Sequence, residues 1–208
     1  MDDAAQAAAY AQADFSESNT LFIEQFRQQF PTVQPHQVLD LGCGPGDICC
    51  RFAETYPGTH VTGVDAAEAM LELAREAAST CSARDRVRFD RGMIQAYDHG
   101  EFDVVLSNSL LHHLADPDSL WHAIKRLAEP GAAVLVMDLV RPDSQEAAQN
   151  LVDCYSGQEP EVLRRDFFNS LCAAFTIDEV EAQLERAGFG SFSVTMVSDR
   201  HMLIRGQI

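Results

Sequence analysis

Residues 38–47 read VLDLGCGPGD, an apolar run that leads into three closely spaced glycines. Such a run is typical of a buried strand, and glycines at its end let a ligand approach the backbone N–H groups closely. The spacing differs from the dinucleotide fingerprint G-x-G-x-x-G, because Asp47 stands where the third glycine would be. The pattern predicts either a ligand loop or a tight turn after the first strand.

Predicted strands and helices alternate from residue 38 to residue 138. The strands are expected at 38–42, 60–65, 87–90, 102–107 and 132–138, and the helices between them at 47–56, 66–80 and 119–129. Parallel strands need crossover connections, which are usually helices, so this order predicts an α/β fold with a parallel sheet covered on both faces. Two further apolar runs, at 191–197 and 200–206, are separated by Ser198-Asp199 and predict an antiparallel C-terminal hairpin.

A single domain over residues 1–208 is the simplest organisation. We divide it into N-terminal cap helices (1–30), a core (38–138), a less regular helical segment (143–173) that is expected to form a lid, and a C-terminal helix and strand hairpin (176–208). The last helix is marked by a capping box from Thr176 to Glu179 and by Gly188 at its end.

Composition excludes several classes of partner. The chain has 15 basic and 32 acidic residues, a formal charge of −17, so its surface is expected to repel nucleic acid. The sequence shows neither an apolar run long enough to span a membrane nor a signal peptide, which predicts a cytoplasmic protein without a membrane partner. Six cysteines without C-x-x-C spacing and scattered histidines predict reduced thiols and no metal. The oligomeric state stays open.

Two aspartates accompany the glycine loop. Asp65 ends the second predicted strand, 23 residues after Gly42, where an acid accepts hydrogen bonds from ribose hydroxyls; it would also suit the cap of the next helix. Asp40 lies inside the first strand, where a buried carboxylate is costly unless it is paired. Beside a ligand it would accept from an ammonium group.

The ordered series VLDLGCGPGD, VTGVDAAEAMLELARE and FDVVLSNSLLHHLADPDSLWHAIKRLAEPGAAVLVMD resembles the class I S-adenosylmethionine-dependent methyltransferases over residues 38–138. The resemblance implies a Rossmann-like three-layer sandwich with a mostly parallel seven-stranded sheet. It also implies S-adenosyl-L-methionine as cofactor and S-adenosyl-L-homocysteine as product. A zwitterionic amino acid tail, rather than a pyrophosphate, would then lie on the glycines.

The same resemblance implies the cofactor-binding residues: Asp40, Gly42, Cys43, Gly44, Asp65, Ala66, Met70, Met93, Ile94, Ser107 and Asn108. Asp40 would lie near the cofactor's amino group, directly or through water, and Asp65 would bind both ribose hydroxyls. Met93 departs from the family, which often has an acid there to bind the adenine amino group.

Where the acceptor carries a proton, the reaction would need a group that removes it. His112 and His113 follow the fourth strand, and the resemblance favours His113, although a structural role in holding the loop is an equal alternative. Candidate acceptor-binding residues lie outside the shared core: Tyr10, Phe15, Tyr155, Arg164, Arg165 and Phe168. The two arginines suggest an anionic acceptor, unless they form surface ion pairs.

We therefore expect an enzyme that methylates an O, N or S atom of a small molecule. The alternatives are a protein or peptide methyltransferase and a non-catalytic S-adenosylmethionine-binding sensor or scaffold.

Overall fold

A computed structural model describes residues 15–208. Its strands are β1 (Gln37–Leu41), β2 (His60–Asp65), β3 (Val87–Arg91), β4 (Phe102–Asn108), β5 (Ala128–Leu139), β6 (Ser193–Met196) and β7 (His201–Gln207). Its α-helices are α2 (Ser16–Gln29), α3 (Asp47–Thr55), α4 (Glu68–Thr80), α5 (Asp118–Leu127), α6 (Gln145–Ser156), α7 (Glu161–Ala173) and α8 (Ile177–Ala187). Short 3₁₀ turns, η1 (Arg84–Arg86) and η2 (Leu111–His113), precede β3 and follow β4.

The seven strands form one sheet in the order β3-β2-β1-β4-β5-β7-β6. β1 to β5 are parallel, whereas β7 runs antiparallel to both of its neighbours, β5 and β6. This arrangement confirms the predicted Rossmann-like α/β fold with a reversed C-terminal hairpin. The chain passes from β3 at one edge back to β4 beside β1, so the carboxyl ends of β1 and β4 meet at a switch point, where sheets of this kind bind ligands.

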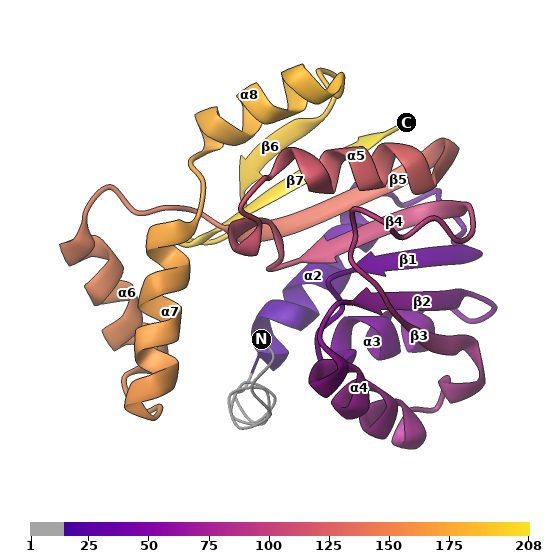
Figure 1. The fold of residues 1–208 in the computed structure, drawn as a ribbon, viewed down its shortest axis with the longest axis horizontal. Coiled ribbons are helices and arrows are strands. Elements are labelled where there is room, and N and C mark those ends of the chain that lie inside the picture. The colour runs from indigo at the N-terminus through magenta and orange to yellow at the C-terminus, as the bar shows by residue number, and fades with distance from the viewer. Residues whose placement is uncertain (1–14) are drawn as a thin grey trace.

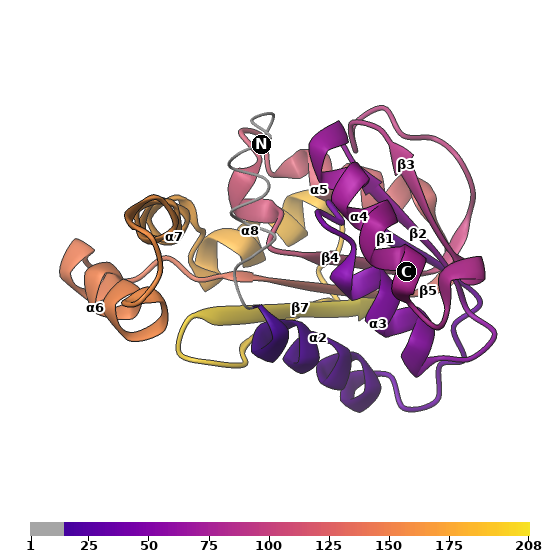
Figure 2. The same ribbon diagram turned by 90° about the horizontal axis from the view of Figure 1, so that it is seen from below.

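Alternation along the strands builds a core on each face of the sheet. On β1, Val38 packs in a cluster with side chains of α2 and α3, whereas Leu39 and Leu41 belong to a cluster that includes Trp121 of α5 and Leu184 of α8. Successive strand residues point to opposite faces, so a nearly continuous apolar run fills both cores. Figures 1 and 2 show the resulting layers, with α2 and α3 on one face and α5 and α8 on the other.

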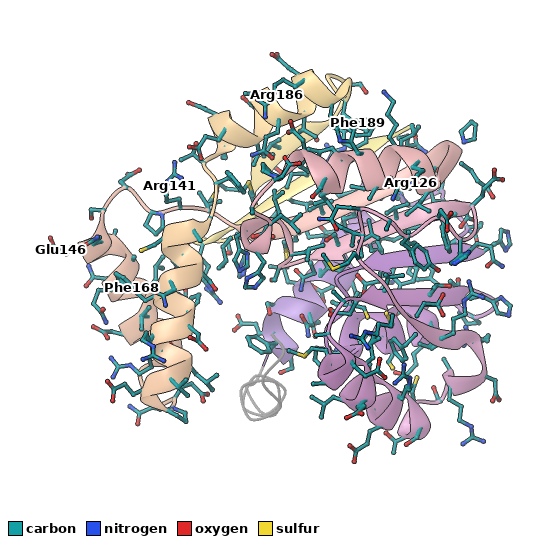
Figure 3. All side chains as sticks on the ribbon, viewed as in Figure 1. Arg126, Arg141, Glu146, Phe168, Arg186 and Phe189 are labelled. Carbon is teal, nitrogen blue, oxygen red and sulfur yellow. The ribbon has the colours of Figure 1, made fainter. Side chains whose placement is uncertain are left out.

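The predicted lid forms the helical pair α6–α7, which stands out beyond the edge of the sheet (Figure 1). It has a small core of its own, composed of Leu139, Ala148, Val152, Leu171 and Ala174 with Phe167 and Phe168 packed against it. The chain leaves and re-enters the main body side by side, because Val140 and Phe175 form an isolated parallel bridge. Arg141, at the point of exit (Figure 3), donates its backbone N–H to the carbonyl of Phe175 over 3.1 Å.

Several boundaries differ from those predicted. α5 ends at Leu127 and β5 begins at Ala128, before the Pro130-Gly131 pair that was expected to separate them. The predicted N-terminal cap region is described from Phe15 onward, as the single helix α2, and Tyr10 lies outside the described residues. Within residues 15–208, no helix is long and apolar enough to cross a bilayer.

Candidate functional site

A cavity of about 930 Å³ opens at the carboxyl edge of the parallel strands. The glycine loop after β1, the end of β2, the loop after β4, the start of α2 and the α6–α7 lid contribute to its walls. It brings together many of the residues singled out in the sequence: Phe15, Asp40, Gly42, Cys43, Gly44, Asp65, Ala66, Met70, Met93, Ile94, Asn108, His112, His113 and Tyr155.

The glycine loop presents bare backbone to this cavity. Gly44 has a φ of +51°, and a Cβ added to it would meet no atom within 4 Å. Positive φ is strained for other residues, and the missing side chain leaves space that a ligand can fill. Gly46 has a different role, because a Cβ there would lie 2.7 Å from Phe89 Cζ and 2.9 Å from Ala74 Cβ. One glycine therefore opens the site and the other lets α3 pack closely.

Asp65 fixes the loop from the end of β2. Its Oδ2 accepts the Gly44 N–H over 3.0 Å and its Oδ1 accepts the Ala67 N–H, just before α4, over 2.8 Å. The alternative predicted for this residue, capping the next helix, is wrong: the N-cap of α4 is Ala67, which has no side-chain cap, and Asp65 binds the N–H of that residue instead. A carboxylate has about four lone-pair sites, so both oxygens retain capacity for the hydroxyls of a ligand.

Asp40 is a buried carboxyl group with no cation beside it. Only 1% of the residue is exposed, and Cys49 Sγ donates a hydrogen bond to its Oδ2 over 3.2 Å. Within residues 15–208, no basic side chain lies within ion-pair distance of it. Burial raises the pKa of Asp40 to about 7, the Cys49 hydrogen bond opposes the rise, and the charge of Asp65 adds to it. A ligand cation in the cavity would offset the cost of burying the ionised carboxylate.

Asn108, at the end of β4, carries an unsatisfied acceptor. Its Oδ1 is buried and has no hydrogen-bond partner in the described part of the chain, while its Nδ2 donates to Asn19 Oδ1 over 3.4 Å. Asn19, on α2, in turn donates to Asp47 Oδ2 over 2.7 Å. Asp40 and Asn108 therefore offer acceptors to one cavity, which fits the ammonium group of an amino acid tail.

The loop after β3 forms the wall expected to face an adenine. Met93 is 58% exposed and lines the cavity together with the buried Ile94. Arg126 of α5 (Figure 3) fixes this loop, because its guanidinium donates to the carbonyls of Ile94 and Tyr97 over 2.8 and 2.9 Å. A tethered apolar wall takes the place of the acid that the family often has at Met93.

The two histidines after β4 differ in their surroundings. His112 is buried, and its Nδ1 lies 2.6 Å from Oδ1 of Asp138, which is only 1% exposed. Asp138, near the end of β5, also accepts the backbone N–H groups of Leu111 and Leu139, both over 2.7 Å. The charge on Asp138 would therefore stabilise an imidazolium formed on His112 and hold its ring in place.

His113 packs against His112, with ring centroids 4.0 Å apart, and is open to the cavity. Desolvation by the surrounding protein, together with the neighbouring His112, lowers the pKa of His113 to about 4. His113 is consequently neutral at neutral pH.

Several residues of the site were missed in the sequence, among them Asp138, Arg200 and His201. Asp138 lies near the end of β5, Arg200 precedes β7 and His201 begins it, and Arg200 and His201 line the cavity. Asp138 ends the predicted strand 132–138 as Asp65 ends the predicted strand 60–65, so its position was a usable signal. Arg200 precedes a strand, and it reaches this edge because β7 runs antiparallel.

Other predicted residues lie away from the cavity wall. Ser107 is fully buried and its hydroxyl donates to the carbonyl of Leu41 over 2.9 Å. Arg164 forms an ion pair with Asp153 of α6 over 2.8 Å, and Arg165 is exposed on α7. Phe168 (Figure 3) packs into the lid core, whereas its neighbour Phe167 lines the cavity. Within residues 15–208, no group of three or more His, Cys, Asp or Glu is placed to hold a metal ion.

Comparison with known proteins places this geometry in a family. A family profile described as a methyltransferase domain matches residues 34–188. The chain is 30% identical over 192 residues to 27-O-demethylrifamycin SV methyltransferase of Amycolatopsis mediterranei (strain S699), covering 89% of this chain and 65% of that protein. It is 34% identical over 128 residues to the ubiquinone biosynthesis O-methyltransferase of Hydrogenovibrio crunogenus, covering 59% and 50%.

The fold also matches a solved structure described as a SAM-dependent methyltransferase from Aquifex aeolicus, with a TM-score of 0.72 and 18% identity. That match covers 99% of this chain and 98% of the other. By contrast, the chain spans less than two thirds of the length of either curated relative.

Proposed function

The chain belongs to the methyltransferase domain family, as the sequence resemblance predicted, and from this we propose that it transfers a methyl group from S-adenosyl-L-methionine to an O, N or S atom of a small molecule. One observation carries the proposal: a single cavity is lined by the buried carboxyl group of Asp40, by Asn108 with its unpartnered Oδ1, and by His112, whose Nδ1 lies against Asp138. The relatives named above are described as acting on small molecules, which supports that acceptor class.

The residues present suit this cofactor. Asp40 and Asn108 would accept from its ammonium group, the backbone at Gly44 would lie along its amino acid tail, and Asp65 would accept from the ribose hydroxyls. When bound, S-adenosylmethionine supplies a methyl group activated by its sulfonium. The protein's own contribution is alignment of the acceptor, exclusion of water by the lid, and removal of a proton where the acceptor carries one.

We propose that the two histidines divide the proton handling. His112 would accept the proton that the acceptor loses, because the buried carboxylate of Asp138 stabilises the positive charge. His113, neutral beside it, would line the acceptor site and position the acceptor against His112. The simpler assignment, with His113 as the base, is the alternative. The free thiols of all six cysteines support our further proposal that the protein works in the reducing cytoplasm.

Release of S-adenosylhomocysteine from purified protein would test the function, with acceptors sorted by nucleophile: thiols, phenols, carboxylates, amines, ring nitrogens and a basic peptide. We expect turnover with one small-molecule class. Asp138→Asn should lower kcat by about 10²–10⁴-fold, the usual contribution of a general base, without changing the KM for the cofactor.

Two outcomes would point elsewhere. Turnover with the basic peptide alone would favour a protein methyltransferase. Tight cofactor binding with no turnover in any class would favour a non-catalytic sensor. A His113→Asn variant that loses activity beside a fully active His112→Asn would assign the base to His113.

A further inference from the structure

Arg200 is the one lysine or arginine among the described residues that line the cavity. The carboxyl groups in the same wall include those of Glu159 and Asp166 on the lid. Surface ion pairs contribute little to stability, so the balancing of surface charge does not explain why Arg200 lies in this lining.

Two contacts hold the Arg200 side chain in one place, and a third joins its two partners. Its guanidinium carbon lies 3.4 Å from the centroid of the Tyr155 ring, and its Nη1 donates to Asp199 Oδ1 over 3.0 Å. Tyr155 closes the arrangement, because its hydroxyl donates to Asp199 Oδ2 over 2.6 Å. The Arg200 side chain is only 14% exposed. A guanidinium fixed in this way loses little further freedom when it binds a ligand.

The backbone places Arg200 on the acceptor side of the cavity. Its carbonyl accepts the Val140 N–H over 2.8 Å, and the next residue, His201, pairs with Leu139 in the β5–β7 ladder. Leu139 directly follows Asp138, the partner of His112. The cofactor candidates Asp40 and Asp65 lie on β1 and β2, with β4 and β5 between them and β7.

From this geometry we infer that Arg200 determines acceptor specificity by donating a hydrogen bond to a neutral oxygen, a hydroxyl or carbonyl, next to the atom that is methylated. A guanidinium has five N–H donors and the contact with Asp199 uses one, so it retains donors for a ligand. Asp199 already balances its charge, and Glu159 in the same lining would repel a carboxylate, so the neutral oxygen is favoured. This inference rests on the proposed function only in treating this end of the cavity as the acceptor site.

The test measures binding rather than turnover, so it gives a result even if methyl transfer is never observed. Protein saturated with S-adenosylhomocysteine would be titrated with phenol, catechol and 2-hydroxybenzoate, which differ at one substituent, and Kd would be followed by NMR. We expect wild type to bind catechol about tenfold or more tightly than phenol, as a hydrogen bond to a charged group allows. Arg200→Ala should abolish that preference while leaving phenol binding unchanged, and Arg200→Lys should keep part of it.

Phenol is the internal control for an intact cavity, and Arg186→Ala is the matched arginine control. Arg186 lies on α8 (Figure 3), where it pairs with Asp118 over 3.1 Å, outside the cavity lining, so its loss should change neither Kd. Equal weakening of phenol and catechol by Arg200→Ala would reveal a merely structural clamp and overturn the inference. Equal binding of the two probes to wild type, or an Arg200-dependent preference for 2-hydroxybenzoate over catechol, would also overturn it.

Discussion

The burial of Asp40 should make the free protein less stable as pH rises, and an Asp40→Asn variant should escape this loss. Folding raises the pKa of this carboxyl from 3.8 to about 7. The unfolded chain therefore releases the proton at a lower pH than the folded protein does. Stability falls as pH rises from about 4 to about 7, in the direction expected for an acid whose pKa is raised by folding.

The magnitude follows from the size of the shift. A change of one pKa unit corresponds to about 1.4 kcal/mol, so a shift of about three units amounts to about 4 kcal/mol above pH 7. That is a large share of the 5–15 kcal/mol that stabilises a typical domain. At pH 5 the same linkage removes roughly 1.5 kcal/mol, because the unfolded chain is already mostly ionised. An asparagine at this position keeps an oxygen that can accept from Cys49 and carries no charge.

Urea unfolding of both proteins at pH 5 and pH 8.5, without ligand, would measure the effect. We expect the advantage of Asp40→Asn over wild type to be about 3 kcal/mol larger at pH 8.5 than at pH 5. Taking the difference between the two pH values removes any constant effect of burying an amide. A matched titration with S-adenosylhomocysteine should show weaker binding to the variant. An advantage that does not change with pH would refute the reasoning.

Three further changes probe other parts of the site. Asp65→Ala leaves the Gly44 and Ala67 N–H groups without their acceptor and should cost about 1–3 kcal/mol of stability in urea unfolding, together with at least a tenfold loss of S-adenosylhomocysteine affinity by calorimetry. Gly46→Ala should destabilise the protein by ~2–5 kcal/mol, through the strain of positive φ and the contact of the new Cβ with Phe89. Gly131→Ala shares the positive φ but has no atom within 4 Å of the new Cβ, so it should lose only the part of this stability that comes from backbone strain. Burial lowers the pKa of His201 to about 4, so this histidine alone should cost wild type about 3 kcal/mol as pH falls from 6.5 to 4, while Asp40 contributes a change of opposite sign in both proteins. The stability of His201→Gln relative to wild type should therefore rise by about 3 kcal/mol over the same urea series.

The sequence was most informative where local pattern and topology agree. The apolar runs that contain Asp40 and end at Asp65 marked β1 and β2, and the carboxyl ends of parallel strands meet at one edge. Asp138 occupies the same kind of position near the end of β5. The alternation of strand residues explains why Ser107 does not line the cavity. Successive residues face opposite sides of the sheet, so Asn108 lines the cavity and Ser107 does not.

Arg200 could not be found by that rule. It lies at the amino end of a strand, and only the reversed direction of β7 brings it to the binding edge. Arg164 forms the ion pair that was the alternative to binding an anionic acceptor, and its partner is Asp153, one helix away. Pairings between separate helices depend on packing angles, which residue spacing along the chain does not contain.

The adjacent exit and entry of the lid have an evolutionary consequence. Because Val140 and Phe175 pair directly, the segment between them leaves and re-enters the main body at one place. Its small core, which also includes Leu139 of β5, is distinct from the two cores that support the sheet. Relatives could therefore exchange or rebuild these 34 intervening residues without disturbing the strands that hold Asp40 and Asp65. New acceptors could then be accommodated by changes in this segment together with Arg200, while the strands that carry Asp40 and Asp65 stay as they are.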